Sequence, residues 1–561
     1  MGGADHTRGL KGAPGRLPGF VPFPSDFASR YRAAGYWEDR PQGVFYGELF
    51  ATHSGRTAIV SGEESITYAQ LSARVDRLAR HLLAMGVRPL DRVVLQLPNV
   101  PAFAYVYFAL QRLGAIPILA LPPHRWTEIS AFVDLAGARG YVAPGGQPEL
   151  AEIATQLPER YSRLDLLFSA GGPLPGAVAV EDLLNREPEV PASALEAIEV
   201  DPDLPCVFQL SGGTTGVPKL IPRTHNDYIY NTKAAAAVND IRPDDRLLVV
   251  LPVAHNFPLA CPGLCGFFMR GARVVLSTSA RPEDIFALVQ RHRVTHLELV
   301  PALLIRCLNS AAIRQFDLRS VRVINTGGQK LQPEVKGRAE ELIPGSVVQE
   351  VFGMAEGLLC YVRLDDPPEV RHETVGRPVS PGDELLLLDD EGRPVREGEV
   401  GELLVRGPYT LRGYYGVPEY NGRAFTSDGF YRTGDLMRRH PSGNYVVEGR
   451  KKDLINRGGE KISAEEVENL VLSHPSVVNV ACVPMPDPVL GERICAFAVL
   501  HDGHSLTLEE LAAFLTAKGL ARFKLPERLE IVPELPLSKF GKVAKNVLSQ
   551  IAAENAAARH S

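Results

Sequence analysis

The strongest chemical signal in this sequence is a nine-residue string rich in glycine and threonine, SGGTTGVPK, at residues 211–219. Its small residues would let backbone N–H groups approach a polyphosphate, while the hydroxyls of Thr214 and Thr215 add donors and Lys219 adds positive charge. Two residues separate the last glycine from Lys219, which argues against a Walker P-loop, where glycine and lysine are adjacent. The string therefore predicts a phosphate-binding loop of another kind. The alternative is a flexible surface loop.

A carboxylate follows a second glycine turn. The string FGMAE at residues 352–356 comes after a strand-like run, Val347–Val351, and ends on Glu356. Mg²⁺ prefers oxygen ligands and is commonly shared between a carboxylate and phosphates, so Glu356 is a candidate magnesium ligand. The alternative is an acid at the N-terminus of a helix.

Two more strings place a polar side chain on a tight turn. YRTGD at residues 431–435 ends on Asp435, which could accept hydrogen bonds from ribose hydroxyls. SKFGK at residues 538–542 presents Lys542 directly after a glycine. Taken singly, such an aspartate is usually a turn residue and such a lysine usually lies on the surface. Their weight comes from occurring with the other motifs.

Alternating apolar strands and amphipathic helices must position these strings. A capping box at Thr67–Gln70 predicts a helix that ends near Gly86, with one apolar face. That face comprises Leu71, Val75, Leu78 and Leu82. Strands are predicted at Val93–Leu97, Leu247–Leu251, Val274–Ser277, His296–Val300 and Val321–Asn325. The alternation predicts an α/β fold with doubly wound, mostly parallel sheets.

The pattern changes twice toward the C-terminus. Residues 380–448 read as short strands separated by Gly/Asp turns, which predicts a smaller β-rich lobe. After GRKKD, the pattern becomes that of a compact α+β unit. We therefore predict a large N-terminal domain over residues 1–448, a hinge at 449–453 and a small, mobile C-terminal domain over 454–561.

Composition narrows the functional classes. The 561 residues are too many for one core, and the net charge of −6 gives no nucleic-acid footprint and no basic face for anionic lipid. Seven cysteines without a CxxC pair favour reduced thiols over a zinc site, and the start of the chain lacks the apolar segment of a signal peptide. We therefore expect a cytoplasmic protein without a membrane partner.

The five motifs, in this order and spacing, resemble the adenylate-forming superfamily of acyl-CoA synthetases, peptide-synthetase adenylation domains and luciferases, over about residues 45–545. Within it, HNFPL at 255–259, RGPYTLRGYY at 406–415, NRGGEKI at 456–462 and the stretch at 20–37 are similar to the stand-alone aryl-acid–AMP ligases of siderophore type. The resemblance implies ATP and Mg²⁺ as cofactors, a small aryl acid as substrate and a phosphopantetheinylated aryl carrier protein as partner.

The resemblance also implies a role for each motif residue. ATP would be held by Ser211, Gly212, Gly213, Thr214, Thr215, Gly216, Lys219, Gly328, Val351, Asp435 and Arg450. Catalysis would use Lys542, His255 and Glu356, with Glu356 as the Mg²⁺ ligand and Lys542 between the substrate carboxylate and the α-phosphate, where charge builds as pyrophosphate departs. The aryl acid would meet Asn256, Phe257, Cys261, Gly328 and Leu359. Lys452 would be the hinge, and Gly458, Gly459 and Lys461 would line a channel for the thiol.

Two pocket residues bear on the substrate. Amino-acid-activating relatives carry aspartate at the position of Asn256, where its charge pairs with the α-ammonium group; a neutral amide would leave that buried ammonium uncompensated. Relatives that activate 2,3-dihydroxybenzoate carry serine at the position of Cys261, and a thiol is a weak hydrogen-bond partner that behaves as a small hydrophobe. Salicylate therefore fits better than 2,3-dihydroxybenzoate. The alternative is that Cys261 only fills space.

Other functions remain open at this point. A more distant possibility within the superfamily is a benzoate–CoA ligase. A docking protein that binds nucleotide without catalysis is a different class, and the presence of Lys219, Glu356, Asp435 and Lys542 speaks against it. A Rossmann dehydrogenase would need a GxGxxG string opening a βαβ unit near the N-terminus, which the sequence does not show.

Overall fold

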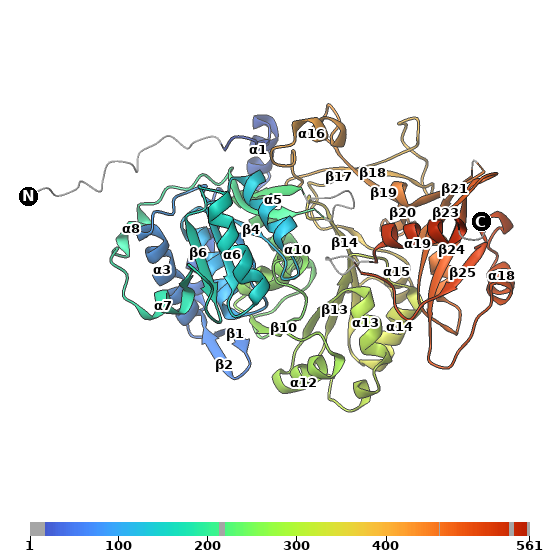
Figure 1. The fold of residues 1–561 in the computed structure, drawn as a ribbon, viewed down its shortest axis with the longest axis horizontal. Coiled ribbons are helices and arrows are strands. Elements are labelled where there is room, and N and C mark those ends of the chain that lie inside the picture. Colours follow the sequence, from blue (N-terminus) through green and yellow to red (C-terminus); the bar gives the residue numbers. More distant parts are fainter. Residues whose placement is uncertain (1–16, 212–218, 459, 538–542, 558–561) are drawn as a thin grey trace, which may run out of the picture.

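The structure is a computed structural model that describes residues 17–211, 219–458, 460–537 and 543–557, with the side chains of Lys452 and Lys461 left out. Four β-sheets organise these residues (Figure 1). Two large sheets lie in the N-terminal part, a small antiparallel sheet follows them, and the last sheet belongs to the C-terminal unit, drawn in red. The predicted α/β fold, with a large N-terminal and a small C-terminal part, is confirmed.

The first large sheet has seven strands in the order β7-β6-β5-β3-β4-β8-β9. Its neighbours are parallel except for the last pair, in which β9 runs antiparallel to β8. The glycine- and threonine-rich string lies between β8 and β9, so the hairpin that joins them carries the candidate phosphate loop. The strands are β3 (Arg92–Leu95), β4 (Ile116–Leu119), β5 (Gly140–Pro144), β6 (Leu166–Ala170), β7 (Val178–Ala179), β8 (Pro205–Leu210) and β9 (Leu220–Thr224).

The second large sheet has nine strands in the order β16-β15-β14-β13-β12-β10-β11-β1-β2. Its six central strands are parallel, and antiparallel strands close both edges. Each strand predicted in this region is present within two residues of its expected bounds. The strands are β1 (Thr57–Ser61), β2 (Glu64–Thr67), β10 (Arg246–Val249), β11 (Arg273–Leu276), β12 (His296–Leu299), β13 (Val323–Gly327), β14 (Val347–Gly353), β15 (Leu359–Tyr361) and β16 (Arg377–Pro378).

The largest hydrophobic core joins the two sheets through helices α2 (Gln42–Thr52), α3 (Tyr68–Ala84), α4 (Pro101–Arg112) and α11 (Gly263–Met269). Nine consecutive residues of α4 are buried, as expected for a helix enclosed on all sides. The predicted capping box of α3 is present, because the Thr67 hydroxyl accepts from the Gln70 N–H and the Gln70 side chain accepts from the Thr67 N–H.

Separate cores lie on the other faces of the two sheets, so each sheet is covered on both faces as in a doubly wound fold. One core packs β4 and β5 against α5 and α6, and the other packs β10, β12 and β13 against α12, α13 and α14. The remaining helices up to the small sheet are α1 (Ser25–Ala33), α5 (Trp126–Ala136), α6 (Pro148–Arg160), α7 (Val180–Asn185), α8 (Ser193–Glu196), α9 (His225–Val238), α10 (Asn256–Ala260), α12 (Pro282–His292), α13 (Pro301–Asn309), α14 (Pro333–Leu342), α15 (Pro368–Glu373) and α16 (Pro418–Ala424).

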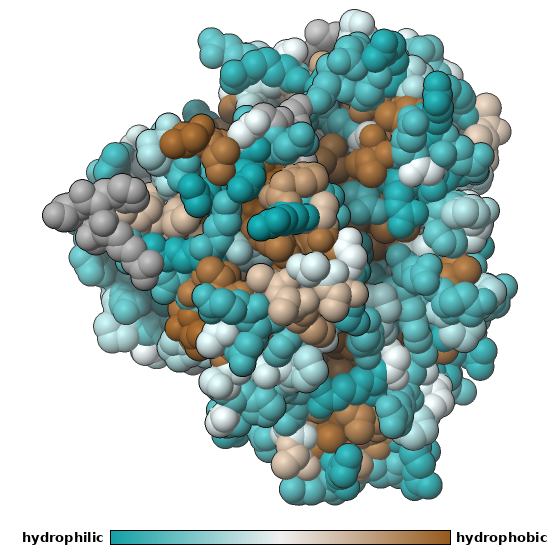
Figure 2. All heavy atoms as spheres, turned by 90° about the vertical axis from the view of Figure 1, so that its right-hand side faces the viewer, coloured by the Kyte–Doolittle hydropathy of each residue, from teal (hydrophilic) through white to brown (hydrophobic). Residues whose placement is uncertain are grey.

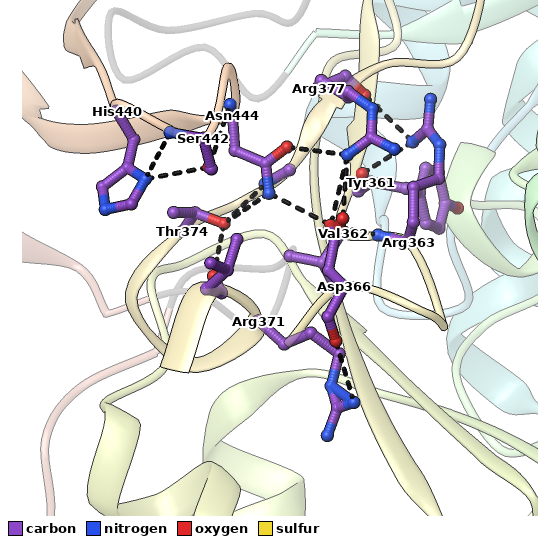
Figure 3. Close-up of polar contacts among 12 residues, drawn as sticks. Tyr361, Val362, Arg363, Asp366, Arg371, Thr374, Arg377, His440, Ser442 and Asn444 are labelled. Carbon is purple, nitrogen blue, oxygen red and sulfur yellow. Dashed lines mark hydrogen bonds and ion pairs between the residues drawn. The ribbon is translucent and has the colours of Figure 1, made fainter. Parts of the chain in front are cut away.

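The small antiparallel sheet is the predicted β-rich lobe, with β17 (Glu384–Leu388), β18 (Gly401–Arg406), β19 (Tyr431–Arg439) and β20 (Tyr445–Arg450) in sequence order. A buried polar cluster ties its β19–β20 turn to the edge of the nine-stranded sheet (Figure 3). Asn444 donates to Asp366 at 3.1 Å and to Thr374 at 3.0 Å and accepts from Arg377 at 3.0 Å, and Arg377 also pairs with Asp366 at 3.0 Å. The lobe is therefore fixed to the large domain.

The C-terminal unit has its own sheet in the order β22-β21-β24-β23, with β25 parallel to β24, and its own cores. Strand β20 of the lobe continues to Arg450, past the predicted boundary at residue 448, and the first strand of the C-terminal sheet begins at Leu454. The boundary, the hinge and the mobility of this unit stay predictions. Its elements are β21 (Leu454–Arg457), β22 (Glu460–Ser463), α17 (Ala464–Leu472), β23 (Val477–Asp487), β24 (Gly491–Leu500), α18 (Leu508–Ala517), β25 (Arg528–Ile531) and α19 (Lys545–Ala557).

The outer face of the C-terminal unit is mostly hydrophilic, with separate apolar patches (Figure 2). Such scattered patches are ordinary on a protein surface. The large apolar side chains that the unit exposes are Val489, Phe523, Ile531, Leu537, Val547 and Ile551. Within the part of the chain that the structure describes, no helix is long and apolar enough to cross a bilayer. All seven cysteines are described, and each is a free, buried thiol.

Candidate active site

The predicted aryl pocket is a small apolar cluster where α10 meets the β14–β15 hairpin. Cys261, Val351 and Leu359 are buried there together, and Phe257 packs against them half-buried. Tyr361 and Tyr409 complete the cluster, and Tyr361 donates a hydrogen bond to the backbone carbonyl of Cys261. The structure thus brings three of the four predicted aryl-acid residues that carry side chains into one place, from segments about a hundred residues apart.

Asn256 is the fourth, and its side chain is held from both ends. The residue begins α10 and is 5% exposed. Its Oδ1 accepts from the Tyr228 hydroxyl at 2.8 Å, and its Nδ2 donates to the Cys261 sulfur at 3.2 Å. Tyr228 in turn accepts from Gln209 on β8 at 2.9 Å. Because these bonds fix the orientation of the amide, the second N–H of Nδ2 is the group of Asn256 left to meet a ligand.

The Cys261 thiol is more polar in its contacts than the sequence suggested. Its sulfur accepts from Asn256 at 3.2 Å and from Asn231 at 3.7 Å. Burial raises the pKa of this thiol to about 12, so it remains protonated at neutral pH. The view of Cys261 as a simple hydrophobe is therefore incomplete: it is a neutral group that accepts two amide donors.

Helix α9 supplies the residues that sequence reasoning missed. Tyr228 and Asn231 project from it into the pocket network, and Arg223 at the end of β9 pairs with Asp227 at 2.8 Å with both side chains fully buried. Arg223 also donates to the backbone carbonyl of Ala355, next to the candidate metal ligand. The signal was available: Thr224 and Asp227 form a capping box, and residues spaced three apart along the helix share a face.

On the nucleotide side, the two ends of the glycine- and threonine-rich string pair with each other. The Ser211 N–H donates to the Lys219 carbonyl at 3.0 Å, and the Lys219 N–H donates to the Ser211 hydroxyl at 2.9 Å. The ammonium of Lys219 lies over the ring of Tyr420, 4.1 Å from its centroid. Gly212, Gly213, Thr214, Thr215 and Gly216 lie outside the described residues.

Glu356 lies in the turn between β14 and β15, so its alternative interpretation as an acid at a helix N-terminus is wrong. Its carboxylate accepts from the Tyr414 hydroxyl at 2.7 Å, and Tyr414 contacts the Tyr431 hydroxyl at 2.8 Å. Since Tyr414 has one hydroxyl proton and gives it to Glu356, Tyr431 must be the donor between the two tyrosines. The Lys219 ammonium lies 5.8 Å from the Tyr414 ring centroid. The candidate phosphate and metal residues thus share one tyrosine cluster.

The donor set at Glu356 suits Mg²⁺ bound together with a nucleotide. Among the described residues there is no group of three histidine, cysteine or acidic side chains that could enclose a metal ion. Glu356 has one oxygen bonded to Tyr414, which leaves a carboxylate oxygen for a cation. Mg²⁺ is commonly bound by one or two carboxylates, with water and phosphate oxygens completing its shell.

The predicted ribose pair is present as a salt bridge. Asp435 on β19 and Arg450 on β20 are register partners, and the Arg450 Nε lies 2.7 Å from Asp435 Oδ1. The neighbouring carboxylate is the leading cause that raises the pKa of Arg450. Val351, predicted to bracket adenine, pairs in register with Gly327, and the next residue, Gly328, has the positive φ of 90° that glycine adopts without strain.

The remaining predicted residues are those assigned to the hinge, to the thiol channel and to catalysis. Lys542 and Gly459 are outside the described residues. Lys452 belongs to the short turn between β20 and β21, and Gly458 and Lys461 belong to the β21–β22 hairpin, where the Gly458 N–H donates to the Leu490 carbonyl at 2.7 Å. His255 precedes α10 and accepts the Phe257 N–H with its Nδ1 at 3.3 Å, so it caps the helix that carries Asn256.

Two curated relatives are similar over almost the whole chain. A protein named salicylyl-CoA synthase / salicylate adenylyltransferase, from Streptomyces sp, is 47% identical over 95% of this chain and 97% of its own. A 2,3-dihydroxybenzoate-AMP ligase from Bacillus subtilis is 44% identical over 96% of this chain and 98% of its own. Since these two relatives are named for different aryl acids and are almost equally identical to this chain, overall identity does not choose between the two substrates.

The apo structure of MbtA from Mycobacterium smegmatis superposes with a TM-score of 0.74 at 40% identity, covering 95% of this chain and 99% of that one. The AMP-binding enzyme family matches residues 48–415, and its C-terminal domain matches residues 466–542. The chain therefore belongs to the AMP-binding enzyme family and carries the C-terminal domain of that family.

Proposed function

We propose that this enzyme joins an aryl acid to AMP. Salicylate is the first candidate for this acid. ATP and the acid give aryl-AMP and pyrophosphate, and the aryl group then passes to the phosphopantetheine thiol of an aryl carrier protein with release of AMP. 2,3-Dihydroxybenzoate is the second candidate substrate. Similarity to a salicylate adenylyltransferase and to a 2,3-dihydroxybenzoate-AMP ligase supports this class of acid.

The observation that carries the proposal is the neutral amide of Asn256 at the aryl pocket. It is buried, bound by Tyr228 and Cys261, and leaves one N–H for a ligand. A buried ammonium group facing this amide would lack a counter-charge, at a cost of several kcal/mol. An ortho hydroxyl can instead accept that N–H. The amide therefore favours a hydroxylated aryl acid over an α-amino acid.

The nucleotide would lie across the tyrosine cluster and the lobe. Lys219 and the string it ends would hold the phosphates, Asp435 would accept the ribose hydroxyls with Arg450 beside it, and Val351 and Gly328 would flank adenine. Mg²⁺ held by Glu356 and phosphate oxygens would neutralise phosphate charge. Lys542 would stabilise the charge that develops on the α-phosphate and the attacking carboxylate.

Salicylate is favoured over 2,3-dihydroxybenzoate by what surrounds Cys261. Its sulfur already accepts two amide donors, and burial keeps the thiol protonated. A second ring hydroxyl beside it would have only a weak sulfur partner. Leu359, 2% exposed in the same cluster, adds an apolar wall. The predicted carrier, rather than coenzyme A, is the acceptor implied by the resemblance to stand-alone aryl-acid ligases.

The test is the exchange of labelled pyrophosphate into ATP with a panel of acids. We expect salicylate to support exchange best, 2,3-dihydroxybenzoate less well, and α-amino acids not at all. Exchange driven by an α-amino acid better than by any hydroxylated benzoate would refute the proposal. Adding carrier protein or coenzyme A to preformed aryl-AMP then identifies the acceptor, with the carrier expected to react faster.

A further inference from the structure

A row of polar side chains lies beneath the aryl pocket, within the nine-stranded sheet. Glu298 on β12, Asn325 on β13 and Gln349 on β14 are register neighbours on one face of these parallel strands. Each is at most 1% exposed. Each also has one side-chain oxygen without a hydrogen-bond partner among the described residues: Glu298 Oε2, Asn325 Oδ1 and Gln349 Oε1. Three such oxygens side by side are unusual, because buried polar groups are normally paired.

The orientation of the two amides is fixed by their other bonds. Gln349 Nε2 donates to the carbonyls of Val238 at 3.1 Å and Val362 at 2.9 Å, which leaves Oε1 as the unpaired end. Asn239 donates to the Ala235 carbonyl, so its Oδ1 must be the acceptor of the 2.7 Å bond from Asn325 Nδ2. Exchanging the oxygen and nitrogen of either amide would put two acceptors together. Both unpaired atoms are therefore acceptors.

Glu298 is the third member, and burial favours its neutral form. Its Oε1 accepts from the Gly263 N–H at 3.0 Å. Burial raises the pKa of this carboxyl well above its usual value, which favours a proton on the free oxygen, Oε2. In this form the row contains three oxygens and one proton. When the Glu298 proton is donated to one neighbouring amide oxygen, the other amide oxygen and a lone pair of Oε2 remain as acceptors.

The row lies next to the groups that form the pocket. Two residues further along β13 and β14, at the carboxyl end of the sheet, are Gly327 and Val351, and Val351 belongs to the pocket cluster. Gly263, which Glu298 binds, follows Cys261 by two residues. Tyr361, a member of the pocket cluster, donates to the Cys261 carbonyl, which ties this segment to the pocket. In α/β sheets, ligands bind at this carboxyl end.

We propose that the natural acid is a salicylate-type ring that carries an aromatic amine, and that Glu298 is the residue that selects it. An aromatic amine presents two N–H donors, one for each of these two acceptors, whereas a ring hydroxyl presents one. The amine would donate to Glu298 Oε2 and to a neighbouring amide oxygen. This inference rests on the proposed function and narrows its substrate class.

The experiment compares amino and methyl groups, which are similar in size, on the same ring. Pyrophosphate exchange is measured with 3-, 4- and 5-aminosalicylate and with the matching methylsalicylates. We expect one of the three aminosalicylates to exceed its matching methylsalicylate in kcat/KM by about 10- to 100-fold, the range of one well-placed buried polar group. Buried water would satisfy the same three oxygens without any preference for the amine.

Glu298→Gln provides the residue-level test. Glutamine keeps an oxygen for the Gly263 N–H but replaces Oε2 by an NH₂ donor, so the amino-to-methyl ratio should fall about tenfold or more. Glu334→Gln, at the exposed start of α14, is the matched control and should leave the ratio unchanged.

Three outcomes decide the matter. If salicylate supports exchange but no aminosalicylate exceeds its matching methylsalicylate, the inference is wrong and the proposed function stands. An amino preference that survives Glu298→Gln removes Glu298 from its assigned role. If no aryl acid supports exchange, the proposed function itself fails. Should Glu298→Gln not fold, the wild-type panel alone still tests the amine.

Discussion

The aryl pocket and the nucleotide side of this enzyme are built from different kinds of group. The polar groups nearest Asn256 are neutral and buried, and they bind one another: Tyr228, Asn231 and the Cys261 thiol. The charged Arg223 and Asp227 lie behind Asn231 and are paired with each other. Across the tyrosine cluster, the groups are charged and partly open to solvent. Arg450 keeps 44% of its side chain exposed although it pairs with Asp435.

The difference indicates how each region recognises its ligand. A neutral network in a low dielectric discriminates by whether each donor meets an acceptor, since an unpaired buried group is costly. Charged groups near water bind phosphate and ribose with less dependence on exact fit. Substrate choice should therefore respond to single-atom changes in the pocket, whereas the nucleotide side should respond to loss of charge.

The largest effect should come from the ion pair beneath the pocket. Asp227→Ala leaves Arg223 charged, buried and unpaired, which should lower the free energy of unfolding by about 3–5 kcal/mol in urea denaturation. Glu63→Ala at the exposed pair with Arg291 is the control and should change the free energy of unfolding little, because solvent screens this pair. If both variants lowered the free energy of unfolding equally, burial of the Arg223–Asp227 pair would not increase its contribution to stability.

The next effect tests the nucleotide side. Lys542→Ala should slow adenylate formation by about 10³-fold, because it removes the cation at the position where charge develops. Transfer of the aryl group from supplied aryl-AMP to the carrier should remain close to that of the wild type. Both half-reactions are measured separately, and an equal loss of both would contradict the role assigned to Lys542.

A smaller effect tests the neutral pocket. Cys261→Ser exchanges a weak sulfur partner for a hydroxyl, so the kcat/KM ratio of 2,3-dihydroxybenzoate to salicylate should rise, by up to ~10²-fold. The two acids are compared in the exchange assay under identical conditions. An unchanged ratio would show that Cys261 only fills space.

The smallest effect tests the hydroxyl that binds the Glu356 carboxylate. Tyr414→Phe removes the hydroxyl that binds Glu356, and the KM for Mg²⁺-ATP should rise about tenfold, as for one hydrogen bond to a charged group. Tyr420→Phe keeps the ring under Lys219 and should change this KM little. A similar rise in both variants would show that the bond from the Tyr414 hydroxyl to Glu356 has no special role.

Much of the fold could be predicted because local signals agreed with it. The capping box of α3 and the strands β10 to β14 lie within two residues of their expected positions, since these strands are short apolar runs bounded by turn residues. The end of β20 was harder to predict. It continues to Arg450 because it pairs with Asp435 on β19, and that partner is distant in sequence.

The candidate site was predictable where a motif is contiguous, and less so where the fold assembles it. Glu356 was found from its turn, and it shares the tyrosine cluster with Lys219. Asp435 was found from its string and pairs with Arg450, but the predicted turn is wrong, because Asp435 lies within strand β19. Tyr228 and Asn231 were missed because their importance comes from α9 crossing next to α10. The row at Glu298 depends on strand order, which pairs β12, β13 and β14 in a way that sequence spacing does not fix.

The polar cluster around Asn444 has a consequence for the order of events during turnover. It holds the turn between β19 and β20 to the large domain, and β20 stays paired with β19 as far as Arg450, opposite Asp435. A turn of the C-terminal unit, as predicted from the sequence, would then pivot downstream of Asp435 and Arg450, the pair proposed to hold ribose. Adenosine would stay bound while the groups around its α-phosphate change, so the reactive aryl-AMP would not need to leave the enzyme between the two chemical steps.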